Sequence, residues 1–234
     1  MTVRSVITLL ILAALAYGGW QAVEHAEREY PEHLPWTPLS LDDPVGRATE
    51  LKIANLAGDR PACLALFEES SLEVTPLEEQ QFTPNCALVE PVALERMTAA
   101  YSPGTVRLSC PLAASLAVWE RQVVQPAARR LLGTGVERIE HLGTYSCRRL
   151  YGRSSGGWSK HATAEAIDIA GFRLEDGRSV SLLGDWGSEG PEGAFLRVIR
   201  NRGCDVFGTL LGPDYNAAHR DHFHLQAAGF GTCR

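Results

Sequence analysis

The stretch "AIDIAGFRLEDGRSVSLL", residues 166–183, is the clearest secondary-structure signal in the chain. Apolar residues lie on both sides of Asp176-Gly177, a dipeptide that favours the tight turn of a β-hairpin. The stretch is therefore expected to form two antiparallel strands. Asp168 lies within the apolar run of the first strand, where an unpaired carboxylate would be costly to bury. A compensating cation is the simplest partner for it.

Helices and further strands are expected on both sides of this hairpin. Residues 111–124, "PLAASLAVWERQVV", repeat apolar side chains at helical spacing, and Pro126 begins a second helical piece that Gly133 ends. Residues 188–203 predict another helix, and strands are expected at 135–145 and 221–226. The fold class predicted is α+β, with helices packed on an antiparallel sheet.

The N-terminus carries an export signal. Residues 5–23 contain no charged side chain, and about 20 apolar residues suffice to span a bilayer. An uncleaved anchor over 1–23, forming one transmembrane helix, is favoured. A cleavable signal peptide is the alternative, with "ALA" at 14–16 as its processing site, although the apolar run continues through Trp20.

The cysteines agree with export. They are even in number, widely spaced and without a Cys-x-x-Cys pair, which indicates disulfides and not metal ligands. The sequence does not choose among the possible pairings, and sequential pairing (63 with 86, 110 with 147, 204 with 233) is the working expectation. The six residues are Cys63, Cys86, Cys110, Cys147, Cys204 and Cys233.

A proline-rich spacer is expected to separate the anchor from the soluble domain. Residues 30–44 hold four prolines, which prevent a continuous helix and favour a stiff, extended segment. We therefore divide the chain into the anchor, a spacer over 24–50 and a domain over 51–234. Residues 51–110 are interpreted as an acidic, disulfide-tied cap, and the metal-site core is placed at about 110–234.

Charge is distributed unevenly along the chain, whose net charge is −6. Residues 24–95 hold fifteen acids and four bases, whereas residues 120–160 hold eight bases and three acids. This balance argues against nucleic acid as a partner. The basic stretch "RRLYGRSSGGWSK", residues 148–160, either faces an acidic or carboxylate-ended substrate or is a solvated surface.

A histidine cluster near the end of the chain is the strongest chemical signal. The stretch "NAAHRDHFHLQ", residues 216–226, contains His219, His222 and His224. If the last part is a strand, His222 and His224 project from one face, because side chains alternate along a strand. A histidine is more often an ordinary polar residue than a ligand, but three within six positions favour a shared site.

A metal centre follows when this cluster is combined with a second motif. His161 precedes Asp168 by seven positions. Together with one histidine of the cluster, they make a set of two imidazoles and one carboxylate. Such a set holds zinc tetrahedrally and leaves a fourth position open, which is the pattern of a catalytic site.

These motifs resemble those of known zinc peptidases. The pattern S-x-H-x6-D (Ser159, His161, Asp168) followed by H-x-x-H-x-H is similar to enzymes that cut D-amino-acid peptides of bacterial cell walls. They include penicillin-insensitive murein endopeptidases and D-Ala-D-Ala dipeptidases and carboxypeptidases, whose fold is shared with the Hedgehog signalling domain.

Several longer blocks resemble the bacterial extensin-like C-terminal domain family over roughly residues 60–234. The blocks are "CPLAASLAVWERQVVQPAARRLLG", "GTYSCRRLYG", "HATAEAIDIAGF" and "LGPDYNAAHRDHFHLQ". The expected fold is therefore Hedgehog/DD-peptidase-like.

The resemblance also implies roles for individual residues. One zinc ion per chain is expected, with a general base beside the metal-bound water and polar residues around the substrate. Arg148 would steady a carbonyl or carboxylate, although the sequence does not separate it from Arg149. The implied assignments are His161, Asp168 and His224 as ligands, His222 as general base, and His219 and Ser159 lining the substrate site.

The function implied is an extracytoplasmic zinc hydrolase acting on peptide bonds of peptidoglycan stems, of D,D-endopeptidase or carboxypeptidase type. The domain would lie in the periplasm, held by the inner membrane or released if the signal is cleaved. Protein partners are not indicated. The alternatives are an inactive zinc-containing binding module and a purely structural envelope protein without metal.

One departure bears on turnover. Ala164 stands three positions after His161, where the related proteins commonly have glycine. A methyl group there narrows the cleft or occupies a backbone position that requires a positive φ.

Overall fold

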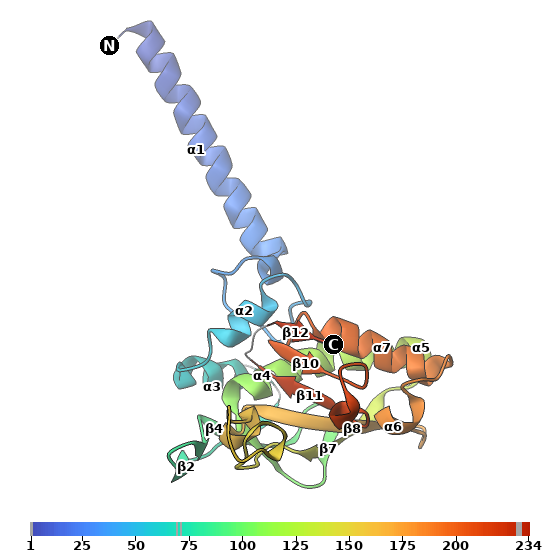
Figure 1. The fold of residues 1–234 in the computed structure, drawn as a ribbon. Helices are drawn as coiled ribbons and strands as arrows, with labels where there is room; N and C mark the ends of the chain where they lie inside the picture. Colours follow the sequence, from blue (N-terminus) through green and yellow to red (C-terminus); the bar gives the residue numbers. More distant parts are fainter. Residues whose placement is uncertain (1, 69, 71, 228–230) are drawn as a thin grey trace.

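The computed structural model describes residues 2–68, 70, 72–227 and 231–234. A single long helix, α1 (Val3–Glu29), projects from a body in which helices cover a sheet (Figure 1). None of the residues of α1 is buried, and its length and hydropathy suffice to cross a membrane. An N-terminal apolar helix is thus confirmed, and it could serve as a membrane anchor or as a signal peptide.

The body is built on one large mixed sheet with the order β1-β4-β5-β7-β8-β11-β10-β12, to which β6 adds beside β4 and β9 beside β8. Its neighbouring strands are antiparallel except for the pairs β5–β7 and β10–β12. The strands are β1 (Glu73–Pro76), β4 (Pro91–Arg96), β5 (Ala100–Ser102), β6 (Val106–Ser109), β7 (Val136–Gly143), β8 (Ala166–Leu174), β9 (Ser179–Ser181), β10 (Thr209–Leu211), β11 (Phe223–Gln226) and β12 (Thr232–Cys233). A separate hairpin joins β2 (Gln80–Thr83) to β3 (Cys86–Leu88).

Helices pack against this sheet, so the α+β class is confirmed. The longer ones are α2 (Thr49–Ala54), α3 (Arg60–Glu68), α4 (Cys110–Trp119), α5 (Gln125–Leu132) and α7 (Pro191–Gly203), with a short α6 (Leu182–Asp185). Single turns are η1 (Pro31–His33), η3 (Leu150–Gly152), η4 (Lys160–Thr163) and η5 (Ala217–His219). The predicted hairpin corresponds to β8 and β9, and the predicted strands 135–145 and 221–226 contain β7 and β11.

The predicted break in the central helix is a π-helical turn, η2 (Glu120–Val124), between α4 and α5. Pro126 follows it and has no amide hydrogen for the helical ladder, which is a usual cause of such irregularities. Every residue of α4 is buried, as expected for a helix that is apolar on all sides. Gly133 ends α5 with φ 76°, the left-handed conformation that glycine adopts readily.

Residues 51–110, interpreted as a disulfide-tied cap, also contribute strands to the main sheet. Four strands from this region, β1, β4, β5 and β6, belong to the main sheet. Three of these four strands have only three or four residues, and so short an alternation gives little signal in a sequence.

All six cysteines form disulfides, but sequential pairing is correct only for Cys204–Cys233. The other two bonds interleave along the chain, joining Cys63 to Cys110 and Cys86 to Cys147. The first links α3 to the start of α4, and the second links β3 to the loop after β7. Packing of elements distant in sequence decides this pairing, so cysteine spacing could not predict it.

The proline-rich segment, residues 30–48, is not a free extended spacer but packs on the body. Lys52 of α2 is buried, and its ammonium donates to the Pro31 carbonyl at 2.7 Å, the Thr37 hydroxyl at 2.8 Å and the Pro38 carbonyl at 3.1 Å. Leu41, also buried, accepts a hydrogen bond from Gln122 at its carbonyl. Prolines exclude a helix here, yet they leave carbonyls free to accept from a buried cation.

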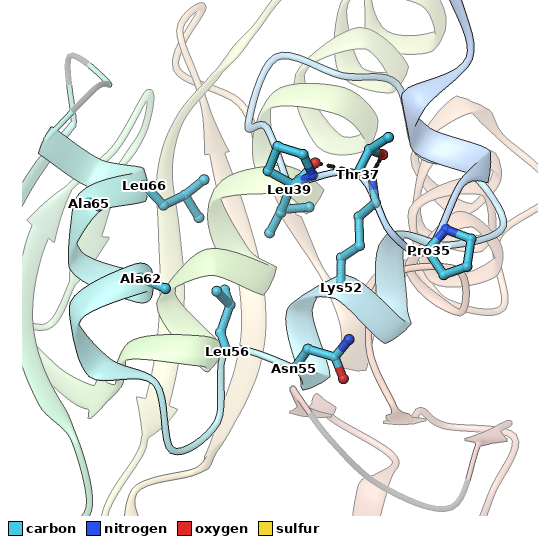
Figure 2. A pocket seen from close by; sticks show the side chains of 10 residues that line it. Pro35, Thr37, Leu39, Lys52, Asn55, Leu56, Ala62, Ala65 and Leu66 are labelled. Carbon is cyan, nitrogen blue, oxygen red and sulfur yellow. Dashed lines mark hydrogen bonds between the residues drawn. The ribbon is translucent and has the colours of Figure 1, made fainter. Parts of the chain in front are cut away.

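A cavity of about 390 Å³ lies beside this segment (Figure 2). Its lining is mainly apolar, with leucines and alanines from α3, from the loop before it and from the proline-rich segment. Lys52 reaches it, but the three hydrogen bonds just described use all three donors of its ammonium group. This cavity therefore offers no free charged group to a ligand.

Glu120, at the start of the π turn, gives a testable pH dependence. Its buried carboxyl accepts from the Ala99 amide and, at 3.3 Å, from the Tyr101 hydroxyl, but burial dominates and raises its pKa to about 7. Between the ordinary pKa of 4.5 and 7 the folded state holds a proton that the unfolded state releases, so stability falls as pH rises through that window. Glu120→Gln should therefore stabilise the protein at pH 8 by on the order of 3 kcal/mol relative to its effect at pH 4.

Urea unfolding at several pH values measures this difference. Glu137→Gln is the matched control, because its side chain is exposed and meets water in both states. Equal effects of Glu120→Gln at pH 4 and pH 8 would contradict the assignment.

Candidate metal centre

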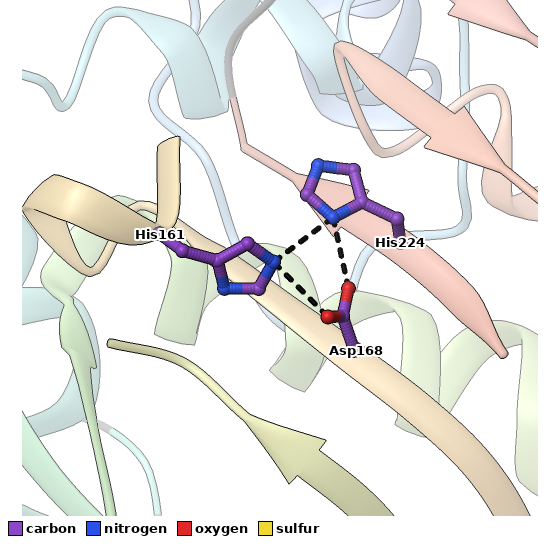
Figure 3. A group of neighbouring side chains, drawn as sticks. All are labelled: His161, Asp168 and His224. Atoms are coloured by element: carbon purple, nitrogen blue, oxygen red, sulfur yellow. Dashed lines mark hydrogen bonds and ion pairs between the residues drawn. The ribbon is translucent and has the colours of Figure 1, made fainter. Parts of the chain in front are cut away.

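The centre of the site is set by the pairing of β8 with β11. In this antiparallel register Asp168 lies directly opposite His224. Asp168 Oδ1 is 2.8 Å from His224 Nδ1, and Asp168 Oδ2 is 3.1 Å from His161 Nε2. His161 comes from η4, just before β8, and its Nε2 is 3.1 Å from His224 Nδ1 (Figure 3). One ligand atom from each of the three residues lies within 4.8 Å of the others.

Backbone contacts orient His161 for metal binding. Its Nδ1 is 2.9 Å from the Thr144 carbonyl, which can only accept, so Nδ1 carries the hydrogen. The lone pair of Nε2 then faces Asp168 and His224. The Ser159 hydroxyl accepts from the His161 amide at 3.3 Å and caps the turn that carries this ligand. Such hydrogen bonds from outside the ligand set commonly fix the ring and tautomer of a metal-binding histidine.

His224 has a similar support on its far side. Its Nε2 lies 2.7 Å from the side-chain amide of Gln226. The oxygen and nitrogen of an amide are assigned from their neighbours. The atom of Gln226 that lies toward Nε2 is the amide nitrogen. Turned by about 180°, the amide would instead place its oxygen there, accept an Nε2 hydrogen and leave the lone pair of Nδ1 facing Asp168 and His161.

In the tautomers that bind a metal, two nitrogen lone pairs and a carboxylate would converge without a hydrogen between them. Such an arrangement is repulsive unless a cation lies at its centre. The donor chemistry therefore fits a divalent metal ion of the type that prefers imidazole and carboxylate ligands.

The charge state of the three residues also suits a cation. Burial would raise the pKa of Asp168, but its contacts with the imidazoles of His161 and His224 outweigh burial and hold that pKa well below its ordinary value. Burial lowers the pKa of His224, partly opposed by Asp168. An ionised carboxylate beside a neutral imidazole is the form that binds a metal.

The other two histidines of the cluster lie beside this triad. His222 Nε2 is 3.6 Å from Asp168 Oδ1, and its Nδ1 is 2.9 Å from Asp221 Oδ1. His219 Nδ1 is 2.8 Å from Asn216 Oδ1, and the rings of His219 and His222 are 5.2 Å apart. Burial, with the charges of His222 and His224, lowers the pKa of His219 to about 4.

A cavity of about 420 Å³ opens onto the triad. It brings together every residue that the sequence assigned to the metal or the substrate. The cavity also contains residues that the sequence did not predict. Gln226 could have been predicted, because it lies two positions after His224 and therefore on the same face of the strand. The lining residues are Arg148, Leu150, Tyr151, Ser159, His161, Asp168, Leu211, Ala218, His219, His222, His224 and Gln226.

The structure separates the two adjacent arginines. Arg148 lines the cavity. Arg149 donates to the Gly156 carbonyl, and its guanidinium lies 4.6 Å from the centre of the Trp158 ring. Arg149 therefore has a structural role within its loop, and Arg148 is the cation available to a bound molecule.

Ala164 adopts the positive φ that the sequence comparison with glycine suggested for this position. It is fully buried with φ 54°, in the left-handed region that costs a residue with a side chain roughly 1–2 kcal/mol. The strain is tolerated because its carbonyl accepts from the Ser109 amide at 2.9 Å and its amide bonds back to His161. With the methyl group present, the ligand atoms of the three residues lie within 4.8 Å of one another.

Comparison with known proteins supports the resemblance to the extensin-like family. A family model described as the extensin-like protein C-terminus matches residues 61–234. The chain therefore belongs to the extensin-like family. No curated protein and no solved structure shows a significant match to it.

The contact of Gln226 predicts an effect on metal affinity. Gln226→Ala removes the amide that orients His224 but leaves all three ligands, so zinc should bind about 10- to 100-fold more weakly. Competition with a chromophoric chelator measures this affinity. Gln80→Ala, on the exposed face of β2, is the control, and unchanged affinity in Gln226→Ala would contradict the role given to the amide.

Proposed function

We propose that the chain is a zinc-dependent hydrolase that cuts peptide bonds in the stem peptides of peptidoglycan. The observation that carries the proposal is the convergence of His161, Asp168 and His224 on one point at the floor of a cavity. Three protein ligands leave a fourth position open, which distinguishes a catalytic zinc site from a closed structural one. The similarity of the motifs to cell-wall zinc peptidases supplies the substrate class.

The remainder of the chain supports an extracytoplasmic location. Three disulfides suit an oxidising compartment such as the periplasm. The apolar helix α1 would attach the domain to the inner membrane, or direct its release if the helix is cleaved. Either arrangement would put the site in the compartment that contains peptidoglycan.

The proposed metal has a defined role. When bound by these residues, zinc would polarise a carbonyl group and lower the pKa of a water molecule to about 7. The protein must then move one proton from water to the departing amine and hold the substrate.

His222 is placed to move that proton. Asp221 Oδ1 accepts from Nδ1, which leaves the lone pair of Nε2 near Asp168 at the edge of the triad. As the C–N bond breaks, the hydroxyl of water joins the carbonyl carbon, and His222 Nε2 carries the other hydrogen to the amine nitrogen. Arg148 would hold a carbonyl or carboxylate group of the peptide.

A second function is favoured by one observation. The buried methyl of Ala164 stands where related proteins commonly have glycine, beside the turn that carries His161. A zinc-containing module that binds the cell wall without turnover is therefore the alternative. Saturable binding to purified peptidoglycan, with one zinc per chain and no peptide released, would favour it.

Digestion of purified peptidoglycan by the zinc-loaded full chain tests the enzyme. Released stem peptides, detected by mass spectrometry, are expected. His222→Gln should keep its zinc and lose roughly 100- to 10,000-fold in rate, because it removes the proton carrier. His25→Gln, exposed on α1, is the matched control.

Two outcomes would overturn the mechanism. One is activity that survives removal of the metal by a chelator. The other is activity that persists in His161→Ala, which removes a ligand.

A further inference from the structure

Two histidines beside the proposed zinc ligands are themselves arranged as metal ligands. His219 and His222 both line the cavity. The Nδ1 atom of each ring faces an oxygen of a nearby side chain, Asn216 Oδ1 at 2.8 Å and Asp221 Oδ1 at 2.9 Å. An oxygen partner on one ring nitrogen leaves the other nitrogen, here Nε2, free to bind a metal ion, and metal-binding histidines usually have such a partner.

The orientation of the Asn216 amide is fixed by contacts at both of its ends. Its oxygen accepts from the Ala218 amide at 2.9 Å, and its nitrogen donates to the Tyr151 hydroxyl at 3.2 Å. The atom that faces His219 Nδ1 is therefore the oxygen, which can only accept. Nδ1 of His219 carries the hydrogen, and the lone pair lies on Nε2.

The spacing of these groups matches that of ligands on one ion. Two imidazoles bound to a tetrahedral zinc have ring centres roughly 5 Å apart, because each nitrogen lies about 2.0–2.1 Å from the metal. The rings of His219 and His222 are 5.2 Å apart. Those of the proposed ligands His161 and His224 are 4.9 Å apart. His222 Nε2 is 3.6 Å from Asp168 Oδ1, close to the roughly 3.4 Å between two ligand atoms of such an ion.

The carboxylate of Asp168 can serve both sets of histidines. Its Oδ2 faces His161, whereas its Oδ1 faces His224 and His222. Two-metal sites of hydrolases hold their ions about 3.5–4 Å apart, a separation that one carboxylate can bridge. A second ion would be held more weakly than the first, because it shares one negative charge with that ion and is repelled by it.

We propose that His219, His222 and the Oδ1 atom of Asp168 form a second, weaker zinc site, and that its filling inhibits the hydrolase. Inhibition follows because Nε2 of His222, the atom that carries the proton, would be bound to the ion. The inhibition rests on the proposed function, whereas the existence of the site does not. As purified, the chain would hold only the first ion.

Zinc titration of the full chain tests the site directly. The protein, in detergent and without a histidine tag, is stripped with a chelator, and zinc binding is then followed by calorimetry. Two steps are expected, a tight one of one ion per chain and a weaker one of a second ion. His219→Gln should lose the second step and keep the first. His25→Gln, exposed on α1, is the matched control and should keep both.

Asn216 offers variants that leave every proposed ligand in place. Asn216→Ala removes the oxygen that orients His219, so the second zinc should bind about 10- to 100-fold more weakly. Asn216→Asp keeps an oxygen for both the Ala218 amide and His219 Nδ1, and should keep the affinity. Unchanged affinity for the first ion shows that the cavity is folded in both variants. An equal weakening of the second step in both would contradict the role of this oxygen.

Inhibition is measured on the same samples. Release of stem peptides from peptidoglycan should rise as the first ion binds and fall roughly 100- to 10,000-fold as the second binds, because the proton carrier is then occupied. In Asn216→Ala the fall should require about 10- to 100-fold more free zinc.

The results separate the second site from the hydrolase. A parent chain that saturates at one zinc, or a second step that persists in His219→Gln, overturns the second site and leaves the proposed function standing. Full activity with two ions bound overturns the inhibition. Absence of peptide release at every zinc concentration overturns the hydrolase, while the titration still decides whether the second site exists.

Discussion

The register between β8 and β11 is the constraint on which the site depends. It places the carboxylate of Asp168 opposite the imidazole of His224, between buried apolar neighbours in both strands. Since side chains alternate along a strand, a shift of β11 by one residue would turn His224 to the other face and leave the carboxylate of Asp168 without this partner. The neighbouring apolar residues therefore specify the same register that the site requires.

The remaining elements hold the third ligand and the walls around this pair. The Thr144 carbonyl, in the residue that follows β7, accepts a hydrogen bond from His161 Nδ1 and fixes the orientation of this ring. The Cys86–Cys147 bond ties the loop after β7 to β3, so one wall of the cavity is anchored covalently. The packing of residues 30–48 on Lys52 connects α1 to the same body.

Local patterns predicted much of this structure. The β8–β9 hairpin, the broken helix around Pro126 and the convergence of His222 and His224 all follow from spacing within a few residues. Long-range packing supplied what the sequence could not show. It decides the Cys63–Cys110 pairing, brings the strands of residues 73–109 into the main sheet, and separates Arg148 from Arg149. The bridge from Tyr151 to Asn216 joins two loops that lie 65 residues apart.

Metal content is the most direct test of the central claim that these residues form a zinc site. The full chain, purified in detergent without a histidine tag and with its disulfides formed, would be analysed for bound elements beside His161→Ala/His224→Ala. The account predicts one zinc per chain in the parent and none in the double variant. A parent chain that takes up no zinc when it is offered at neutral pH, or a double variant that binds it equally, would contradict the account.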